Sequence, residues 1–270
     1  MSTVILSEVR KIRSTRLWWI LLLCMIAGVA FMAGAIGFSL AFADQLGGAG
    51  AEGGGAGMGP VETAQIIYTL PVSFGYVFPV ILGALAVTSE FRHRTIDTSL
   101  LLEPSRAKVI GAKFIAVLPF ALLYAIVGVA TGAVVGAGAL ALGGEPTGLD
   151  QAEIWQTLGM SVVALTGWGL VGVGFGTALT NQVVVIVALL GWTQLVEPIV
   201  RFALAFVEPL AGVGQFMPGA AGEAIAGASF YSTAGVSDLL SPWAGLLVLL
   251  GYAAVAAVIG WLTTFRKDIS

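Results

Sequence analysis

Long apolar stretches separated by short clusters of charge are the dominant pattern of this sequence. Five stretches between successive charged residues are long enough to cross a bilayer as a helix, which takes about 20 apolar residues. The fourth stretch, 154–196, is too long for one span, and the polar turn at Thr180, Asn181 and Gln182 divides it in two. The pattern predicts six transmembrane helices at about 17–43, 63–88, 110–142, 154–179, 183–207 and 240–264.

Composition supports an all-α polytopic membrane protein with one transmembrane domain over residues 1–270. Of the residues, 58% are hydrophobic and 10% charged, with a mean hydropathy of +0.97, whereas a soluble domain has about 25% charged residues. A soluble domain and a disordered chain are therefore both excluded. The pI of 5.1 gives no basic surface for nucleic acid. The single cysteine, Cys24, allows no intrachain disulfide and no thiolate metal cluster.

The distribution of lysine and arginine predicts the orientation in the membrane. Eleven of the twelve basic residues lie before the first span, between the second and third spans or at the foot of the third, or after the sixth. The segments 44–62 and 145–153 contain none. Because cytoplasmic loops accumulate basic residues, we expect both termini on the cytoplasmic side. An excess of arginine over lysine, with abundant alanine and glycine, suggests a bacterial cytoplasmic membrane.

Two further segments lie outside the predicted spans. In residues 1–16, Ile5, Val9 and Ile12 recur at helical spacing among charged residues, which indicates a cytoplasmic helix lying on the membrane surface. A simple positively charged anchor is the alternative. In residues 208–239, glycine, proline and polar residues interrupt every apolar run well before 20 residues, so we expect short or re-entrant helices on the outer face.

Motifs for catalysis are absent from the sequence. There is no phosphate-binding G-x-x-x-x-G-K-[ST] motif and no H-E-x-x-H motif, since His93 is the sole histidine. We therefore expect no enzyme activity, and no cofactor or metal bound by this chain.

Ionisable residues and prolines mark a candidate pathway within the spans. Glu197 and Arg201 lie four residues apart in the fifth span, a spacing that allows a helical ion pair. Ionisable groups at membrane depth are candidates for function, although a self-neutralised structural pair is the simpler alternative. Pro71 and Pro79 predict kinks in the second span, which suit a pathway-lining helix but are also common in ordinary membrane helices.

The segment 89–108 is the one sizeable polar element on the predicted cytoplasmic side. It mixes both signs of charge with apolar residues, and Pro104 ends any helix before it. Charge patterning alone would make it a topology anchor. As a candidate partner-docking loop, its residues of interest are Glu90, Phe91, Arg92, His93, Arg94, Thr95, Asp97 and Arg106.

The same segment resembles the signature that follows the second span in membrane subunits of ABC-2 type ABC exporters. The matching residues are Glu90-Phe91-Arg92-His93, Thr95, Leu100-Leu101, Pro104, Ser105-Arg106 and Lys113. The six spans, the amphipathic first helix and the segment around 217–219 resemble that family too, whereas Arg94 stands where the family often has glycine.

This resemblance implies a division of labour between subunits. Two six-span halves pair, as a homodimer or a heterodimer, and each docks a separate ABC ATPase that binds ATP and Mg. Residues 90–98 would form the coupling helix that receives the ATPase, and the second and fifth spans would line the substrate route.

The leading hypothesis is therefore the permease subunit of an ATP-driven exporter. A proton-coupled secondary transporter that uses Glu197 is the first alternative, and a non-transporting membrane scaffold is the second. Few polar groups occur in the spans, so lipids, hydrophobic drugs and amphipathic peptides all stay open as substrates.

Overall fold

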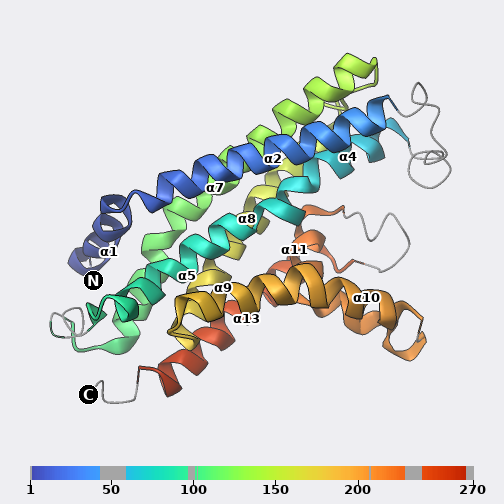
Figure 1. The fold of residues 1–270 in the computed structure, drawn as a ribbon. Helices are drawn as coiled ribbons and strands as arrows, with labels where there is room; N and C mark the ends of the chain where they lie inside the picture. Colours follow the sequence, from blue (N-terminus) through green and yellow to red (C-terminus); the bar gives the residue numbers. More distant parts are fainter. Residues whose placement is uncertain are drawn as a thin grey trace.

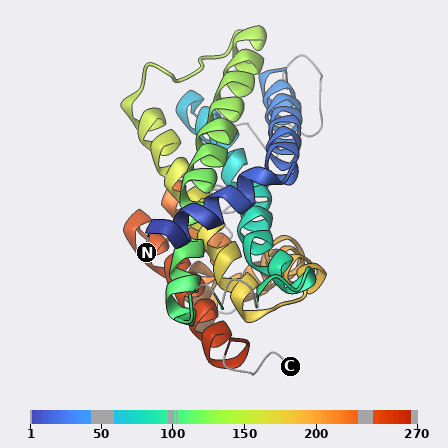
Figure 2. The ribbon, with the colours of Figure 1, turned by 90° about the vertical axis from the view of Figure 1, so that its left-hand side faces the viewer.

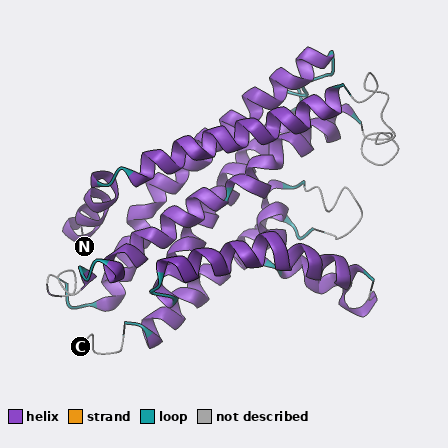
Figure 3. Cartoon of the chain, viewed as in Figure 1, coloured by secondary structure: helices purple, strands orange, loops and turns teal. Residues whose placement is uncertain are grey.

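The computed structural model describes residues 2–42, 59–96, 101, 103–206, 208–228 and 239–265. Within these ranges the chain consists of helices and connecting turns, and no strand occurs (Figures 1 and 3). The helices are α1 (Ser2–Ser14), α2 (Leu17–Ala41), α4 (Pro60–Leu70), η1 (Pro71–Gly75), α5 (Val77–Arg92), α7 (Arg106–Gly143), α8 (Ala152–Ala178), α9 (Gln182–Gly191), η2 (Trp192–Val196), α10 (Glu197–Ala205), η3 (Glu208–Phe216), α11 (Pro218–Ala226) and α13 (Pro242–Thr263).

Six helical stretches in the described ranges are long and apolar enough to cross a membrane, which confirms the prediction of six spans. They are Leu17–Ala41, Val61–Arg92, Arg106–Gly143, Ala152–Ala178, Gln182–Leu204 and Pro242–Thr263. Helices are the expected solution, because each satisfies its backbone hydrogen bonds internally where no water is present.

Local sequence signals set the ends of several spans. The Asn181 side chain accepts hydrogen bonds from the backbone N–H groups of Val183 and Val184, at 3.0 and 3.2 Å, and so caps the start of α9. This is the polar turn that divides the long fourth apolar stretch. Gly144, with φ of 81°, ends α7 in the left-handed conformation that glycine adopts without strain.

Helix α8 forms the centre of the bundle and packs along α5, α7 and α13. Small residues allow this close approach: a Cβ atom added at Gly83 of α5 would overlap the carbonyl oxygen of Gly169 in α8. Trp168 of α8 is almost fully buried and stacks near Tyr76, with ring centroids 4.4 Å apart. The more exposed apolar faces belong to α2 and to the span that contains α9 and α10.

Two spans change to a π-helical turn partway along their length. The second span does so in η1, which begins at Pro71, and the fifth in η2, which is followed by Pro198 in the first turn of α10. Proline lacks a backbone donor, so the i to i−4 ladder is interrupted near both turns. The predicted irregularity at Pro71 thus takes the form of a π turn, whereas Pro79 lies within the regular helix α5.

The N-terminal helix crosses the bundle at one end. Figure 2 shows α1 lying steeply across α7, and α1 packs against that helix. The junction between α5 and α7 and the end of α13 lie at this same end of the molecule (Figure 1). At the opposite end, the segment after the fifth span forms η3 and α11, and α11 turns back to pack on α8 and α13.

Candidate functional site

Four charged side chains from three helices meet at the end of the bundle where α1 crosses α7. They are Glu8 and Lys11 of α1, Glu90 of α5 and Lys113 of α7, and we call them the buried charge cluster. Lys113 Nζ lies 2.7 Å from a carboxylate oxygen of Glu8 and 2.8 Å from one of Glu90. Lys11 Nζ lies 2.5 and 2.7 Å from the same two carboxylates. The cluster thus joins the first helix to the second and third spans.

The ion pairs of the cluster differ in how far they are buried. The Lys113 side chain is 0% exposed and also donates to the carbonyl oxygen of Ala86 at 3.1 Å, whereas the Lys11 side chain is 43% exposed. Burial by itself raises the pKa of the Glu8 carboxyl, but Lys113 and Lys11 together outweigh it and hold that pKa below its ordinary value. Burial likewise lowers the pKa of Lys11, and hydrogen bonds to Glu8 and Glu90 raise it to a net value above the ordinary one.

The expected docking residues fall into a buried and an exposed set. Glu90 lies in the last turn of α5 and is buried, so its carboxylate faces α1 and α7. Arg92, His93 and Arg94 follow it and are exposed. Arg92 donates to the Gln182 side chain at 3.0 Å, and Arg94 has a φ of 54°, a conformation that glycine adopts at lower cost.

Of the coupling helix expected over 90–98, the structure describes residues 90–96: the first three belong to α5, and Ile96 is again helical. Helix α5 continues to Arg92, a turn follows at 93–94, and the backbone N–H of Thr95 donates to the Glu90 carbonyl at 2.9 Å. The span is longer than its charges indicated because the charge cluster neutralises Glu90. Asp97 lies outside the described residues.

The two other loop residues anchor the end of the last span. The Phe91 ring meets that of Phe265 edge to face, with centroids 5.5 Å apart. Arg106, the first residue of α7, donates to the backbone carbonyl of Phe265. Ile96 and Ile110 are buried in the same small apolar cluster. The α5 to α7 junction is therefore packed against the end of α13.

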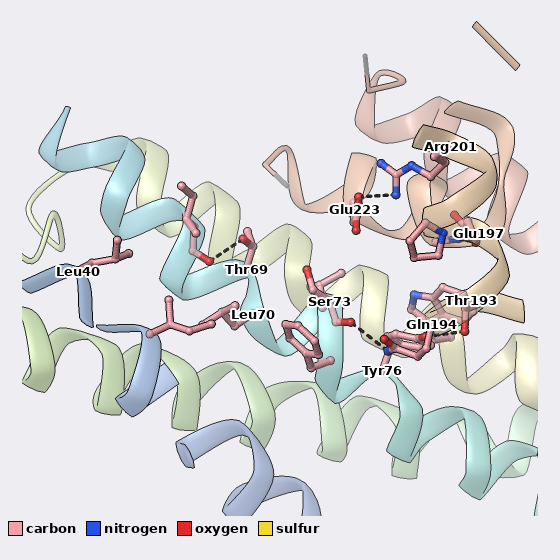
Figure 4. A pocket seen from close by; sticks show the side chains of 17 residues that line it. Leu40, Thr69, Leu70, Ser73, Tyr76, Thr193, Gln194, Glu197, Arg201 and Glu223 are labelled. Carbon is pink, nitrogen blue, oxygen red and sulfur yellow. Dashed lines mark hydrogen bonds and ion pairs between the residues drawn. The ribbon is translucent and has the colours of Figure 1, made fainter. Parts of the chain in front are cut away.

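A second site lies between the second and fifth spans, at the level of the two π turns. Here a cavity of about 370 Å³ is enclosed by residues of α2, the second span, α8, the fifth span and α11 (Figure 4). Tyr76 donates to the Thr193 hydroxyl at 2.5 Å, and the Gln194 amide reaches the Ser73 carbonyl at 3.5 Å. These contacts link η1 and its following residue to η2.

Glu197 and Arg201 both line this cavity, each bonded to α11. The Glu197 carboxylate accepts from the backbone N–H groups of Gly219 and Ala220, at 2.9 and 2.7 Å, at the start of α11. Arg201 donates to the Glu223 carboxylate at 3.0 Å. The sequence suggested that Glu197 and Arg201 neutralise each other, and these bonds in addition tie both residues to a helix that follows them in the chain.

The two prolines of the second span lie away from the cavity wall. Pro71 packs toward Gly132 of α7, where a Cβ atom would come within 2.6 Å of the proline ring, and Pro79 is buried near Gly169 of α8. The cavity wall on this span consists instead of the residues beside Pro71, among them Val72, Ser73 and Tyr76.

Sequence reasoning missed several residues of both sites. Glu8 and Glu223 gave no local signal, because their partners Lys113 and Arg201 lie 105 and 22 residues away. Pro198 was a visible signal, since a proline within an apolar span predicts an irregular turn. Among the described residues, no group of three or more His, Cys, Asp or Glu side chains could hold a metal ion.

Comparison with known families identifies the chain. A family model described as an ABC-2 family transporter protein matches residues 4–207, which is about three quarters of the sequence. No curated protein matches it. The match includes nearly all of α1, the buried charge cluster, the segment 89–108 and five of the six spans, and it ends before the segment around 217–219 and the sixth span. The chain belongs to the ABC-2 family of transporter proteins and is a membrane-embedded permease of an ABC-type transporter.

Proposed function

We propose that this permease is the pathway-forming half of an ATP-driven exporter in a bacterial cytoplasmic membrane. In this proposal both termini are cytoplasmic, a second permease half completes the pathway, and ATP with Mg is bound by the ABC ATPase. Membership of the family supports the expectation that the chain acts together with an ABC ATPase subunit. The positions of the basic residues support the orientation.

The observation that carries the proposal is the link between an exposed basic turn and a buried charge cluster. Arg92, His93 and Arg94 are exposed to a partner, and Phe91 alone separates them from Glu90 in the chain. Glu90 is bonded to Lys113 of the third span and Lys11 of α1. A partner that displaces the turn would therefore move α1, the second span and the third span together.

Charge reversal of the exposed turn tests ATPase docking. The double variant Arg92→Glu and Arg94→Glu should insert and fold normally, because both side chains are exposed, and should lose the ATPase during purification in mild detergent. The double variant Arg10→Glu and Arg13→Glu is the matched control, since it reverses two exposed charges on α1 at the same end of the bundle. Retention of a stoichiometric ATPase by the double variant would contradict docking at this turn.

We further infer that the cavity between the second and fifth spans is part of the substrate route. Apolar side chains such as Ile36, Leu40 and Leu70 make up much of its wall, and the hydrogen-bonded Ser73 and Gln194 add polar groups to it (Figure 4). Such a wall suits an apolar substrate that carries a few polar groups. Lipids, hydrophobic drugs and amphipathic peptides all have this character.

The geometry of Glu197 counts against proton-coupled transport. Its two carboxylate oxygens accept backbone hydrogen bonds from the start of α11, and its side chain is 1% exposed. A carboxylate in this arrangement caps a helix, so both of its oxygens are already committed to structural hydrogen bonds. Transport by liposomes that contain the chain without an ATPase, driven by a proton gradient, would reverse this conclusion. Unchanged cellular function with the partner's ATP hydrolysis blocked would favour the scaffold.

A further inference from the structure

A second cavity, separate from the one between the second and fifth spans, opens beside α1. Its volume is about 600 Å³, and α1, the start of α2, the end of α5 and the first residue of α9 enclose it. Leu17 and Trp18 of α2 and Leu82 and Leu85 of α5 form an apolar wall. These residues belong to the predicted spans, so the apolar wall lies at the depth of the acyl carbons nearest the inner membrane surface.

The remaining wall is polar and includes the charged side chains Glu8, Lys11, Glu90 and Arg92. The buried charge cluster forms its base and is neutral as a whole, because two carboxylates face two ammonium groups. Arg92 and His93 lie on the rim and are exposed. Four further exposed arginines, outside the cavity lining, lie at this end of the molecule: Arg10, Arg13, Arg16 and Arg94.

The Arg92 side chain is held in place at this rim. One of its terminal nitrogens donates to Gln182 of α9 at 3.0 Å, which fixes the guanidinium between α5 and the start of the fifth span. A guanidinium has five N–H groups in a planar fork that matches the oxygens of a phosphate. His93 follows it on the same rim and can add a second donor.

We propose that this cavity binds one acidic phospholipid of the inner leaflet. The phosphodiester head contacts Arg92 and His93, and the first carbons of the acyl chains lie along Trp18, Leu82 and Leu85. A soluble phosphate would leave the apolar wall unused, and a zwitterionic lipid would gain less from the surrounding arginines. Basic pockets beside spans on the cytoplasmic side bind such headgroups in this way. This proposal goes beyond ATPase docking and does not depend on it.

Lipid retention by the purified protein tests the proposal. The chain is reconstituted in nanodiscs of equal phosphatidylglycerol and phosphatidylcholine, extracted in mild detergent, and the bound lipids are counted by native mass spectrometry. We expect one phosphatidylglycerol to be retained by the unaltered chain. In Arg92→Gln the retained fraction should fall about fivefold, the factor for about 1 kcal/mol per basic residue near an anionic lipid surface.

One control and one further variant separate this site from general attraction to lipid. Lys108→Gln removes an exposed charge at the same end of the bundle but outside the cavity, and its retention should match that of the unaltered chain. Thr15→Trp places a bulky side chain at an exposed position of the wall and should also reduce retention. Three results would overturn the proposal: equal retention of both lipids, equal loss in Lys108→Gln, or displacement of the lipid by millimolar inorganic phosphate, which would mark a site for a soluble anion.

Discussion

The two lysines of the buried charge cluster allow a stringent test of how burial determines stability. Both ammonium groups contact Glu8 and Glu90, Lys113 at 2.7 and 2.8 Å and Lys11 at 2.5 and 2.7 Å. Their side chains differ mainly in exposure, 0% for Lys113 against 43% for Lys11. If burial decides the strength of the interaction, methionine should be far more damaging at one position than at the other.

The expected magnitudes follow from what each substitution leaves behind. Lys113→Met leaves two buried carboxylates with one half-exposed ammonium, and loss of a buried partner of this kind costs about 3–5 kcal/mol. In Lys11→Met the more buried ammonium still contacts both carboxylates, and solvent screening reduces the cost to about 1 kcal/mol or less. Addition of Glu8→Gln to Lys113→Met should recover part of the loss, because it removes one uncompensated charge.

The assay compares apparent melting temperatures of the detergent-solubilised chain at one scan rate, since membrane proteins unfold irreversibly. The free protein, with no ATPase present, isolates the folding effect from any effect on docking. Equal shifts for Lys113→Met and Lys11→Met would refute the argument, because the cluster would then be hydrated to the same extent on both sides. Strict additivity of Glu8→Gln with Lys113→Met would refute the charge explanation and leave lost packing as the cause.

Three further outcomes follow from the same geometry. The pKa of Glu8 is lowered from 4.5 and that of Lys11 is raised from 10.5, so the cluster contributes its full stabilisation between these two pH values. The melting temperature should fall when the pH drops through the lowered pKa of Glu8 or rises through the raised pKa of Lys11. Glu8→Gln should flatten the acid side of this pH dependence. Glu197→Gln keeps one acceptor for α11 and should cost about 1–2 kcal/mol in a thermal shift assay. In Gly83→Ala the added methyl group would overlap the α8 backbone, so the variant should no longer elute as a single monodisperse peak in size-exclusion chromatography. Gly138→Ala, with open space around the added methyl group, should elute as the unaltered chain does.

The sequence predicted the spans well because hydrocarbon imposes a simple rule on helices. A run of about 20 apolar residues has few alternatives in a bilayer, and Asn181 marked the single interruption within the long fourth stretch. Charge was a weaker guide to helix ends. Glu90 and Arg92 indicated that the second span stops before them, yet α5 includes both because Lys113 and Lys11 compensate the carboxylate.

The partners of charged residues could not be predicted from spacing along one helix. The four-residue spacing of Glu197 and Arg201 suggested a local ion pair, but α11 offers unpaired backbone N–H groups and the Glu223 carboxylate at the same depth. A helix that begins inside a bundle must satisfy its first N–H groups, and the Glu197 carboxylate meets this demand in addition to its attraction to Arg201. Such a demand becomes visible once the fold places α11 beside α10.

The hydrogen bond between Tyr76 and Thr193 provides the last and most direct test of the proposed route. It joins the second span to the π turn of the fifth at 2.5 Å, while the Tyr76 ring stays packed on Trp168. Tyr76→Phe removes this bond and keeps the ring, so the two spans should separate more readily. A hydrogen bond contributes about 1 kcal/mol net, which corresponds to about a fivefold shift between closed and open forms.

Thiol labelling can measure that shift. In a Cys24→Ser background, Ser73→Cys places one thiol on the cavity wall, and Tyr76→Phe should raise its reaction rate with a water-soluble maleimide about fivefold. Tyr68→Phe is the matched control, since it removes a hydrogen bond to the Thr147 carbonyl that does not connect the second and fifth spans. An unchanged rate in Tyr76→Phe, or an equal increase in Tyr68→Phe, would mean that the contact between the π turns does not control access, and the route would then have to be sought elsewhere in the bundle.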